Sequence, residues 1–471
     1  MERKSTLVSS QELSQQKEYL QMVNLFLDSK FATKPPKAFT RTYGCQGNIA
    51  DSQQINGMLE EMGYDFTDDV KEADLILYNT CAVREHAQDR VFGNVGALKV
   101  LKESNPDLII ALCGCMMQQE HIAQKIQKSY SYVDLVFGTH VFYKLPEFIY
   151  KRLCENKKIV DITNSSGVIA EGITQRRDST IKAFLPITYG CNNFCSYCVV
   201  PYVRGRERSR AFDDVMGEAK QLVASGYKEI TLLGQNVNSY GKDLGVPNAF
   251  SNLLKSINDI QGDFLIRFMT SHPKDCTKEL LNTMAQCEKV ERHLHLPFQS
   301  GNNKVLKEMN RGYTREKYLE LVKTAKELMP DISLTSDVIV GFPGETYEEF
   351  CDTLSLVEEV EFSSLYTFIY SKREGTKAAN MPDNISHSEK SKWFTQLTDL
   401  QEGIASKRMA KMKGKTYRVL AEGFGKDKMI SGRASNYMII EFEAPPSVIG
   451  TFCDVEITQP LTWIARGRIK E

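Results

Sequence analysis

The sequence of 471 residues lacks long apolar runs and has almost no net charge. No segment approaches the roughly 18 consecutive apolar residues that a transmembrane helix needs, so we expect no membrane association. The N-terminal segment MERKSTLVSSQELSQQKEYL is polar and lacks the apolar core of a signal peptide, which favours a cytoplasmic protein. The formal net charge of −1 gives no global indication of a nucleic-acid partner.

Cysteine is plentiful in this chain. It has 12 cysteines and no secretion signal, a combination that favours metal or redox use over disulfides. Hydrophobic residues make up 42% and charged residues 25%, as in ordinary soluble globular proteins. The length suits roughly two to four domains. We expect a monomer.

Three cysteines, Cys191, Cys195 and Cys198, form the pattern C-x3-C-x2-C. Structural zinc sites usually pair two separated C-x2-C units and have four ligands, but no fourth Cys or His follows here at ligand spacing. Three thiolates on a cubane iron–sulfur cluster leave one iron open for chemistry. The pattern therefore predicts an enzyme with such a cluster. A structural zinc knuckle and unrelated core cysteines are the alternatives.

Residues 1–36 are polar, rich in Gln and Ser, and end in the breaker Lys34-Pro35-Pro36, which predicts a helical or partly disordered extension. From residue 37 to about 154, short apolar runs alternate with helical periodicity. The runs AFTRTY, ADLILYNT and DLIIALCG are typical of strands, with helices between them. Strands that alternate with helices predict an α/β fold with a parallel sheet.

This first region has a cysteine after each of three predicted strands. Cys45 follows the first strand, Cys81 follows the second, and Cys115 ends the third. Because the carboxyl ends of parallel strands meet at one rim, the three thiols are expected to converge there. The positions predict a second three-cysteine metal site. Cys113 competes with Cys115 because the two residues share a strand face, and chance placement of small apolar cysteines is the alternative.

After about residue 410 the pattern changes to short β-rich runs broken by Gly and Pro. They are KTYRVLAEGF, KMISGRASNYMIIEF and GTFCDVEITQPLTWIARGRI. Such runs predict a small antiparallel β-barrel.

The motifs TYGCQ-x-N, NTC-x-VRE and GC-x-x-Q, followed by C-x3-C-x2-C and VVPYVRGRERSR, resemble those of the methylthiotransferase family of radical S-adenosylmethionine (SAM) enzymes. The resemblance covers about residues 37–471. It implies a methylthiotransferase N-terminal domain over 37–154, a radical SAM core with a partial (β/α) barrel over 177–407, and an RNA-binding TRAM domain over 410–471. One departure is Gly47, where many members have Met; it removes no ligand.

The resemblance implies two [4Fe–4S] clusters and SAM as cofactors. It resolves the choice between Cys113 and Cys115 in favour of Cys115. The implied ligand sets are Cys45, Cys81 and Cys115 for an auxiliary cluster, and Cys191, Cys195 and Cys198 for the cluster that binds SAM.

The same resemblance indicates SAM contacts in the core. Tyr197 corresponds to the aromatic residue beside the adenine, and Gly234, Gln235 and Asn236 lie where contacts to the SAM amino group are expected. Gly341, in VGFPGE after a predicted strand, is expected to let the backbone approach SAM. A simple turn after a strand explains such glycines equally well.

A basic string follows the cysteine loop, with arginines at Arg204, Arg206, Arg208 and Arg210. It is interpreted either as a solvated face or as a grip on substrate phosphates or the SAM carboxylate, for which the guanidinium shape is suited. We assign no catalytic role to the histidines near predicted strand ends, His272, His293 and His295. In the TRAM-like segment, Tyr437 and Trp463 are predicted to be available for stacking on RNA.

The resemblance implies the reaction of a tRNA methylthiotransferase. One SAM yields a radical, a second supplies a methyl group, and the auxiliary cluster holds the sulfur. The stretch HLHLPFQSGNNKVLKEMNRGYT resembles that of the branch of the family that acts on isopentenyl-adenosine next to the anticodon, and the resemblance implies this substrate. Threonylcarbamoyl-adenosine in tRNA, and a non-catalytic iron–sulfur scaffold that binds RNA, are the alternatives. Partners implied besides tRNA are a flavodoxin- or ferredoxin-like electron donor and a donor of sulfur or clusters.

Overall fold

The computed structural model describes residues 7–82, 85–163 and 167–470, and they form two compact units, each described here by itself. The first unit holds the described residues among 1–178 together with 189–192 and 198–210. The second holds 179–188, 193–197 and the described residues from 211 onward. Within the described residues, none of the helices is long and apolar enough to cross a membrane.

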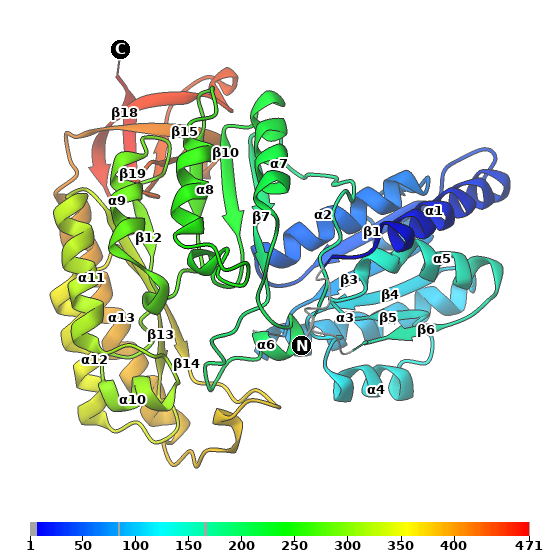
Figure 1. The fold of residues 1–471 in the computed structure, drawn as a ribbon, viewed down its shortest axis with the longest axis horizontal. Coiled ribbons are helices and arrows are strands. Elements are labelled where there is room, and N and C mark those ends of the chain that lie inside the picture. Colours follow the sequence, from blue (N-terminus) through cyan, green and yellow to red (C-terminus); the bar gives the residue numbers. More distant parts are fainter. Residues whose placement is uncertain (1–6, 83–84, 164–166, 471) are drawn as a thin grey trace. The chain divides into compact units, whose positions relative to one another are not determined.

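A parallel six-stranded sheet forms the centre of the first unit (Figure 1). Its strand order is β2-β1-β3-β4-β5-β6, and every neighbouring pair is parallel, which confirms the predicted α/β sheet. The strands are β1 (Lys37–Thr42), β2 (Asp65–Phe66), β3 (Leu75–Thr80), β4 (Ile109–Gly114), β5 (Leu135–Phe137) and β6 (Ile159–Asp161). The helices are α1 (Ser10–Lys30), α2 (Gln46–Glu61), α3 (Glu85–Ser104), α4 (Glu120–Ser129), α5 (Leu145–Cys154) and the short α6 (Val200–Val203).

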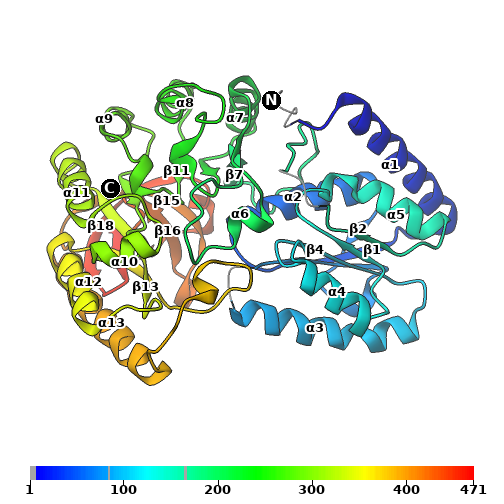
Figure 2. The same ribbon diagram turned by 60° about the horizontal axis from the view of Figure 1, so that its bottom comes forward.

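Helices cover both faces of this sheet (Figure 2). One apolar core joins the sheet to α1, α2 and α5, and the other joins it to α3 and α4. Of the two alternatives for the N-terminal segment, helical or partly disordered, the structure has a helix, α1, and residues 1–6 of that segment lie outside the described residues. Val23 and Leu27 of α1 are fully buried in the first core, and Gln16 donates a hydrogen bond to Glu147 of α5. This helix is therefore packed into the first unit.

The second unit begins with strand–helix repeats that form six parallel strands in two three-stranded sheets. The sheets are β11-β10-β7 and β12-β13-β14, and an isolated parallel bridge pairs Ile266 of β11 with Val290, shortly before β12. The strands are β7 (Lys182–Pro186), β10 (Glu229–Leu233), β11 (Leu265–Phe268), β12 (His293–His295), β13 (Ser333–Val340) and β14 (Ser364–Ile369). The helices are α7 (Phe212–Ala224), α8 (Ala249–Asn258), α9 (Lys278–Gln286), α10 (Asn303–Glu308), α11 (Arg315–Leu328), α12 (Tyr347–Val360) and α13 (His387–Ala410). The predicted partial (β/α) barrel is confirmed.

A closed five-stranded barrel ends the chain, in the order β15-β16-β17-β19-β18. Its strands are β15 (Thr416–Phe424), β16 (Ile430–Ala434), β17 (Ile439–Phe442), β18 (Phe452–Pro460) and β19 (Ile464–Ile469). Four of the pairings are antiparallel, but β17 and β19 pair in parallel to close the barrel. Closure leaves no edge strand exposed for pairing with another chain.

The turn between β16 and β17 packs against strands β11 and β12 of the partial barrel. Arg267 of β11 is fully buried and forms ion pairs with Glu229 (2.5 Å) and Glu291. The Tyr437 ring lies parallel to the imidazole of His293, with ring centroids 4.5 Å apart. It also lies 5.2 Å from the Arg267 guanidinium. The prediction that Tyr437 offers its ring to RNA is therefore wrong, because packing inside the second unit occupies that ring.

Candidate functional site

The three auxiliary cysteines lie where neighbouring parallel strands end. Cys45 caps the N-terminus of α2 directly after β1, Cys81 follows β3, and Cys115 follows β4. The sulfur atoms of Cys45 and Cys115 lie 3.7 and 3.8 Å from one atom, Oδ1 of Asn48. A Cβ added to Gly44 would lie 2.8 Å from the Cys81 sulfur, and this glycine has a φ of +114°. The predicted convergence at one rim is therefore what the first unit contains.

Gly114 decides which of the two neighbouring cysteines faces the rim. Its φ is +95°, it ends β4, and an added Cβ would lie 2.3 Å from Oδ1 of Asn79. Cys113, inside the strand, belongs to the apolar core beneath α1, α2 and α5. Cys115, beyond the glycine, packs instead with Val199 and Val203. The assumption that the two cysteines share a strand face is wrong, because the positive φ of Gly114 ends the alternation.

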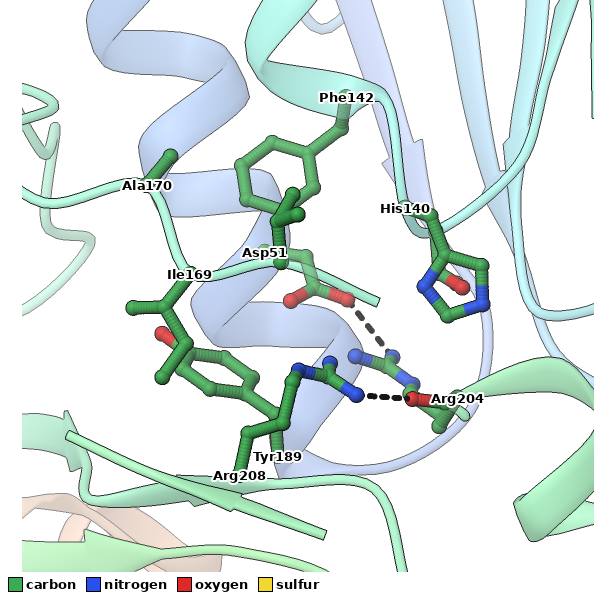
Figure 3. Close-up of a pocket in the computed structure, with 10 residues that line it drawn as sticks. Asp51, His140, Phe142, Ile169, Ala170, Tyr189, Arg204 and Arg208 are labelled. Carbon is green, nitrogen blue, oxygen red and sulfur yellow. Dashed lines mark hydrogen bonds and ion pairs between the residues drawn. The ribbon is translucent and has the colours of Figure 1, made fainter. Parts of the chain in front are cut away.

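A polar group of side chains, Asn48, Asp51 and Arg204, lies beside these thiols. Figure 3 shows the pairing of Asp51 with Arg204. Arg204 donates from Nε to the Cys115 sulfur (3.0 Å), and its Nη2 lies 2.7 Å from the Asp51 carboxylate. Burial raises the pKa of the Cys115 thiol to about 12, although the Arg204 charge opposes the shift. The pKa of Arg204 is raised despite its burial, because the Asp51 carboxylate and Cys115 favour the cation.

The side chains at this rim fit a metal cluster better than a single metal ion. Among the described residues, no three His, Cys, Asp or Glu side chains already surround a point where one metal ion would sit. A cubane cluster is larger than one ion, and thiolates are the ligands that iron–sulfur clusters use. A buried guanidinium beside a thiol provides the compensating charge that an anionic cluster needs. The donor set and its surroundings therefore fit an iron–sulfur cluster.

A small cavity of about 20 Å³ is lined by Asp51 and Arg204 together with His140 and Arg208 (Figure 3). Burial, together with the charges of Arg208 and Arg204, lowers the pKa of His140 to about 4, so the imidazole is neutral at physiological pH. The volume of the cavity suits about one water molecule. The cavity is therefore too small for SAM.

The three cysteines predicted to bind the SAM cluster lie in one loop, and parts of this loop belong to different units. Cys191 and Cys198 belong to the first unit and Cys195 to the second. Within the second unit, Arg311 donates to the Cys195 sulfur and to the Tyr197 hydroxyl, each at 3.3 Å. The pKa of Arg311 is raised despite burial, because the neighbouring Tyr197, Tyr313 and Cys195 favour its charge. A second buried guanidinium thus lies against a predicted cluster ligand.

The carboxyl ends of β10 and β11 carry buried polar atoms that lack hydrogen-bond partners among the described residues. Asn236 donates to Asp275 (2.6 Å), but its Oδ1 has no partner there. The same holds for Nε2 of His272 and the hydroxyl of Ser271, and for the hydroxyl of Ser196 in the cysteine loop. Burial, then the charges of Arg311, Lys274 and Lys242, lower the pKa of His272 to about 2. Buried polar atoms normally have partners, so these atoms fit a polar ligand such as SAM.

The remaining predicted SAM contacts are placed as follows. Tyr197 is half-buried among apolar side chains. At Gly234 the backbone lies so close to Thr188 that an added Cβ would be 2.4 Å from its side chain. Gln235 is half-buried beside Asn236. Gly341 has a φ of +70°, and its N–H donates to the buried carboxylate of Glu345. These contacts remain predictions.

The arginine string is largely buried. Arg204, Arg208 and Arg210 are buried and only Arg206 is exposed, so the interpretation as a solvated face is wrong for three of the four. Arg210 pairs with both carboxylate oxygens of Glu171, at 2.7 and 2.8 Å. Sequence reasoning missed Arg311, Asp51 and the role of Asn48, although the quoted motifs include Asn48 and Arg311.

Sequence comparisons place three regions in known families. Residues 185–357 match the radical SAM superfamily, residues 37–138 match the uncharacterized protein family UPF0004, and residues 410–470 match the TRAM domain. The chain is 48% identical to the tRNA-2-methylthio-N(6)-dimethylallyladenosine synthase of Acetivibrio thermocellus, over 99% of this chain and 98% of that protein. It is 49% identical to the protein of the same name from Thermoanaerobacter sp. strain X514, over 91% and 92%.

The fold resembles that of a solved radical SAM methyltransferase, TsrM from Kitasatospora setae. The TM-score is 0.53 and the identity 15%, over 73% of this chain and 75% of that one. At this identity, the similarity concerns the fold alone.

Proposed function

Because the chain belongs to the tRNA-2-methylthio-N(6)-dimethylallyladenosine synthase family of radical SAM enzymes, we propose that it attaches a methylthio group to carbon 2 of isopentenyl-adenosine next to the anticodon of tRNA. The observation that carries this proposal is the convergence of three thiols at one rim of the N-terminal sheet, in a chain that also contains the C-x3-C-x2-C loop. The name of the relatives favours this substrate over threonylcarbamoyl-adenosine. A non-catalytic scaffold is not favoured.

The chain's own residues are proposed to hold two [4Fe–4S] clusters. Cys45, Cys81 and Cys115 would bind the auxiliary cluster, and Cys191, Cys195 and Cys198 would bind the cluster at which SAM is cleaved. When bound, the clusters and SAM supply radical hydrogen abstraction, sulfur and a methyl group, chemistry that side chains alone do not perform.

Protein groups orient and charge-balance these cofactors. Arg311 joins Cys195 to Tyr197, so it would fix the cluster loop against the residue proposed to lie beside the adenine. Oδ1 of Asn236 would accept a hydrogen bond from the polar end of SAM, and Nε2 of His272 would donate one to it, because Nδ1 of His272 accepts from the Lys274 N–H. These two atoms support the proposed contacts at Gly234, Gln235 and Asn236.

tRNA recognition is proposed to involve the C-terminal barrel. The family is named for action on tRNA, and the barrel matches the TRAM domain. Trp463 directly precedes β19, and about half of its side chain is exposed. Stacking of RNA bases on an exposed aromatic residue does not depend on the RNA sequence. We further propose a cytoplasmic monomer that receives electrons from a flavodoxin- or ferredoxin-like protein.

The test separates the two cysteine triads. After anaerobic reconstitution, the Cys45→Ala/Cys81→Ala/Cys115→Ala variant is expected to cleave SAM reductively to 5′-deoxyadenosine but to form no methylthio-nucleoside. Cys113→Ala is the matched control, because Cys113 lies in the apolar core and not at the rim. Full methylthiolation by the triple variant, with sulfide excluded, would show that these thiols are only structural.

A further inference from the structure

A buried cation lies against the auxiliary cysteines. Arg204 is 7% exposed, and its Nε donates to the Cys115 sulfur at 3.0 Å. Its Nη2 reaches the Asp51 carboxylate at 2.7 Å and the Asn48 amide oxygen at 2.9 Å. Figure 3 shows the Asp51 side chain on its helix pointing toward the guanidinium. Three contacts therefore fix the guanidinium in one orientation beside Cys115.

Asn48 connects the guanidinium to a second cysteine. Its side chain is fully buried, and its Nδ2 donates to the carbonyl oxygen of Thr80 at 2.9 Å. This bond identifies Oδ1 as the atom that faces Arg204 and the sulfur atoms of Cys45 and Cys115. Arg204 and Asn48 together form a polar wall beside two of the three thiols.

The charge of this site requires such a cation. As ligands of a bound cluster the three cysteines would be thiolates, and removing their charge and that of the Asp51 carboxylate from water is costly without a compensating cation. His140 does not compensate, because its lowered pKa of about 4 leaves it neutral. Nη1 of Arg208 donates to the backbone carbonyl oxygens of Arg204 and Arg206, at 3.2 and 2.6 Å. Arg204 places its guanidinium within hydrogen-bonding distance of a rim thiol.

We propose that Arg204 is a positioning residue for the auxiliary cluster. Held by Asp51 and Asn48, it donates a hydrogen bond to the Cys115 thiolate and offsets the negative charge of the bound cluster. Hydrogen bonds to sulfur and local charge set the reduction potential of such clusters, so Arg204 raises this potential and strengthens retention of the cluster. This inference rests on the proposed assignment of Cys45, Cys81 and Cys115 to that cluster.

The arrangement also gives the arginine string a specific role. Arg204 follows Cys198 through the short helix α6, so one segment carries a predicted ligand of the SAM cluster and then the cation of the auxiliary cluster. Arg210, in the same segment, is equally buried and pairs with Glu171. Arg210 therefore provides a matched control for loss of a buried arginine in the same segment.

The experiment uses the Cys191→Ala/Cys195→Ala/Cys198→Ala protein, so that the auxiliary cluster is the one observed. Arg204→Met, Arg204→Lys and Arg210→Met are added to it. Iron and sulfide content, a redox titration followed by electron paramagnetic resonance, and the rate of cluster loss to a chelator are measured. None of these readouts depends on enzyme activity.

Arg204→Met is expected to lower the midpoint potential and to weaken iron affinity by about 10–100-fold, as loss of an outer-sphere partner typically does. Arg204→Lys keeps the charge and is expected to stay closer to the parent, and Arg210→Met is expected to match the parent. Equal potentials and chelator resistance in Arg204→Met and Arg210→Met would overturn the inference. If Arg204→Met does not fold, Arg204→Gln against Arg204→Lys makes the same comparison. A parent protein without iron would instead refute the cluster assignment itself.

Discussion

Replacing Arg267 with methionine is expected to weaken the attachment of the C-terminal barrel. The Arg267 guanidinium is fully buried between the carboxylates of Glu229 and Glu291, and its Nη2 lies 3.5 Å from the carbonyl oxygen of Ala434 in the barrel turn. The pKa of Arg267 is raised despite burial, because Glu291 and Glu229 favour its charge. Methionine has a similar length but leaves two buried carboxylates without a cation.

The magnitude follows from that loss. Removing one partner of a buried ion pair costs about 3–5 kcal/mol. At an m-value of about 3 kcal/mol per molar urea, this cost lowers the unfolding midpoint of the second unit by about 1–2 M. The triple variant Arg267→Met/Glu229→Gln/Glu291→Gln removes the uncompensated charges and is expected to recover much of the loss.

Limited proteolysis locates the effect. Lys411, Lys413 and Lys415 are exposed in the connection between α13 and β15. Trypsin is expected to separate the barrel faster in Arg267→Met than in the wild type, because the turn at Tyr437 loses its contact with the guanidinium. A midpoint within about 0.3 M of the wild type, which corresponds to about 1 kcal/mol, with unchanged proteolysis would refute this reasoning.

Three further predictions concern other parts of the molecule. Burial raises the pKa of Glu345 to about 7 from 4.5; its protonated form stabilises the fold, so about 3 kcal/mol is lost as the pH rises from 4.5 to 7, and Glu345→Gln is expected to remove that part of the pH dependence of urea unfolding. Trp463→Ala is expected to lower tRNA affinity by about 1–3 kcal/mol in a binding titration while SAM cleavage without tRNA persists; unchanged affinity would move RNA recognition elsewhere. Reconstituted wild-type protein is expected to hold about eight irons and the Cys191→Ala/Cys195→Ala/Cys198→Ala variant about four, whereas zinc at either triad would contradict the cluster assignment.

The parallel sheets could be predicted because they depend on local patterns. Strand-like runs separated by helices indicated the N-terminal sheet, the family resemblance implied the partial barrel, and the sheet topology confirms both. The convergence of Cys45, Cys81 and Cys115 followed from the same logic, since the carboxyl ends of parallel strands share one rim. The relation between Cys113 and Cys115 did not, because it depends on the positive φ of Gly114, a backbone feature that spacing does not reveal.

Long-range packing explains the other differences. The Tyr437 ring was predicted to be available for stacking on RNA. It stacks instead on His293, which is distant in the chain. The parallel pairing of β17 with β19 likewise depends on how the barrel closes and not on either strand's composition. Contacts between residues far apart in sequence leave no periodicity that a single sequence displays.

The arginine string shows the same limit at the candidate site itself. Four alternating arginines satisfy a solvated face and an anion grip equally well, because both depend only on charge density. The partners decide the outcome, and they come from distant segments: Asp51 from α2 for Arg204, and Glu171 for Arg210. The free-energy cost of removing a guanidinium from water is high unless such partners exist. Each buried guanidinium therefore marks a place where the fold needs positive charge. At Arg204 that place is beside a thiol, so the charge of Arg204 is better explained by the cysteines than by RNA phosphates.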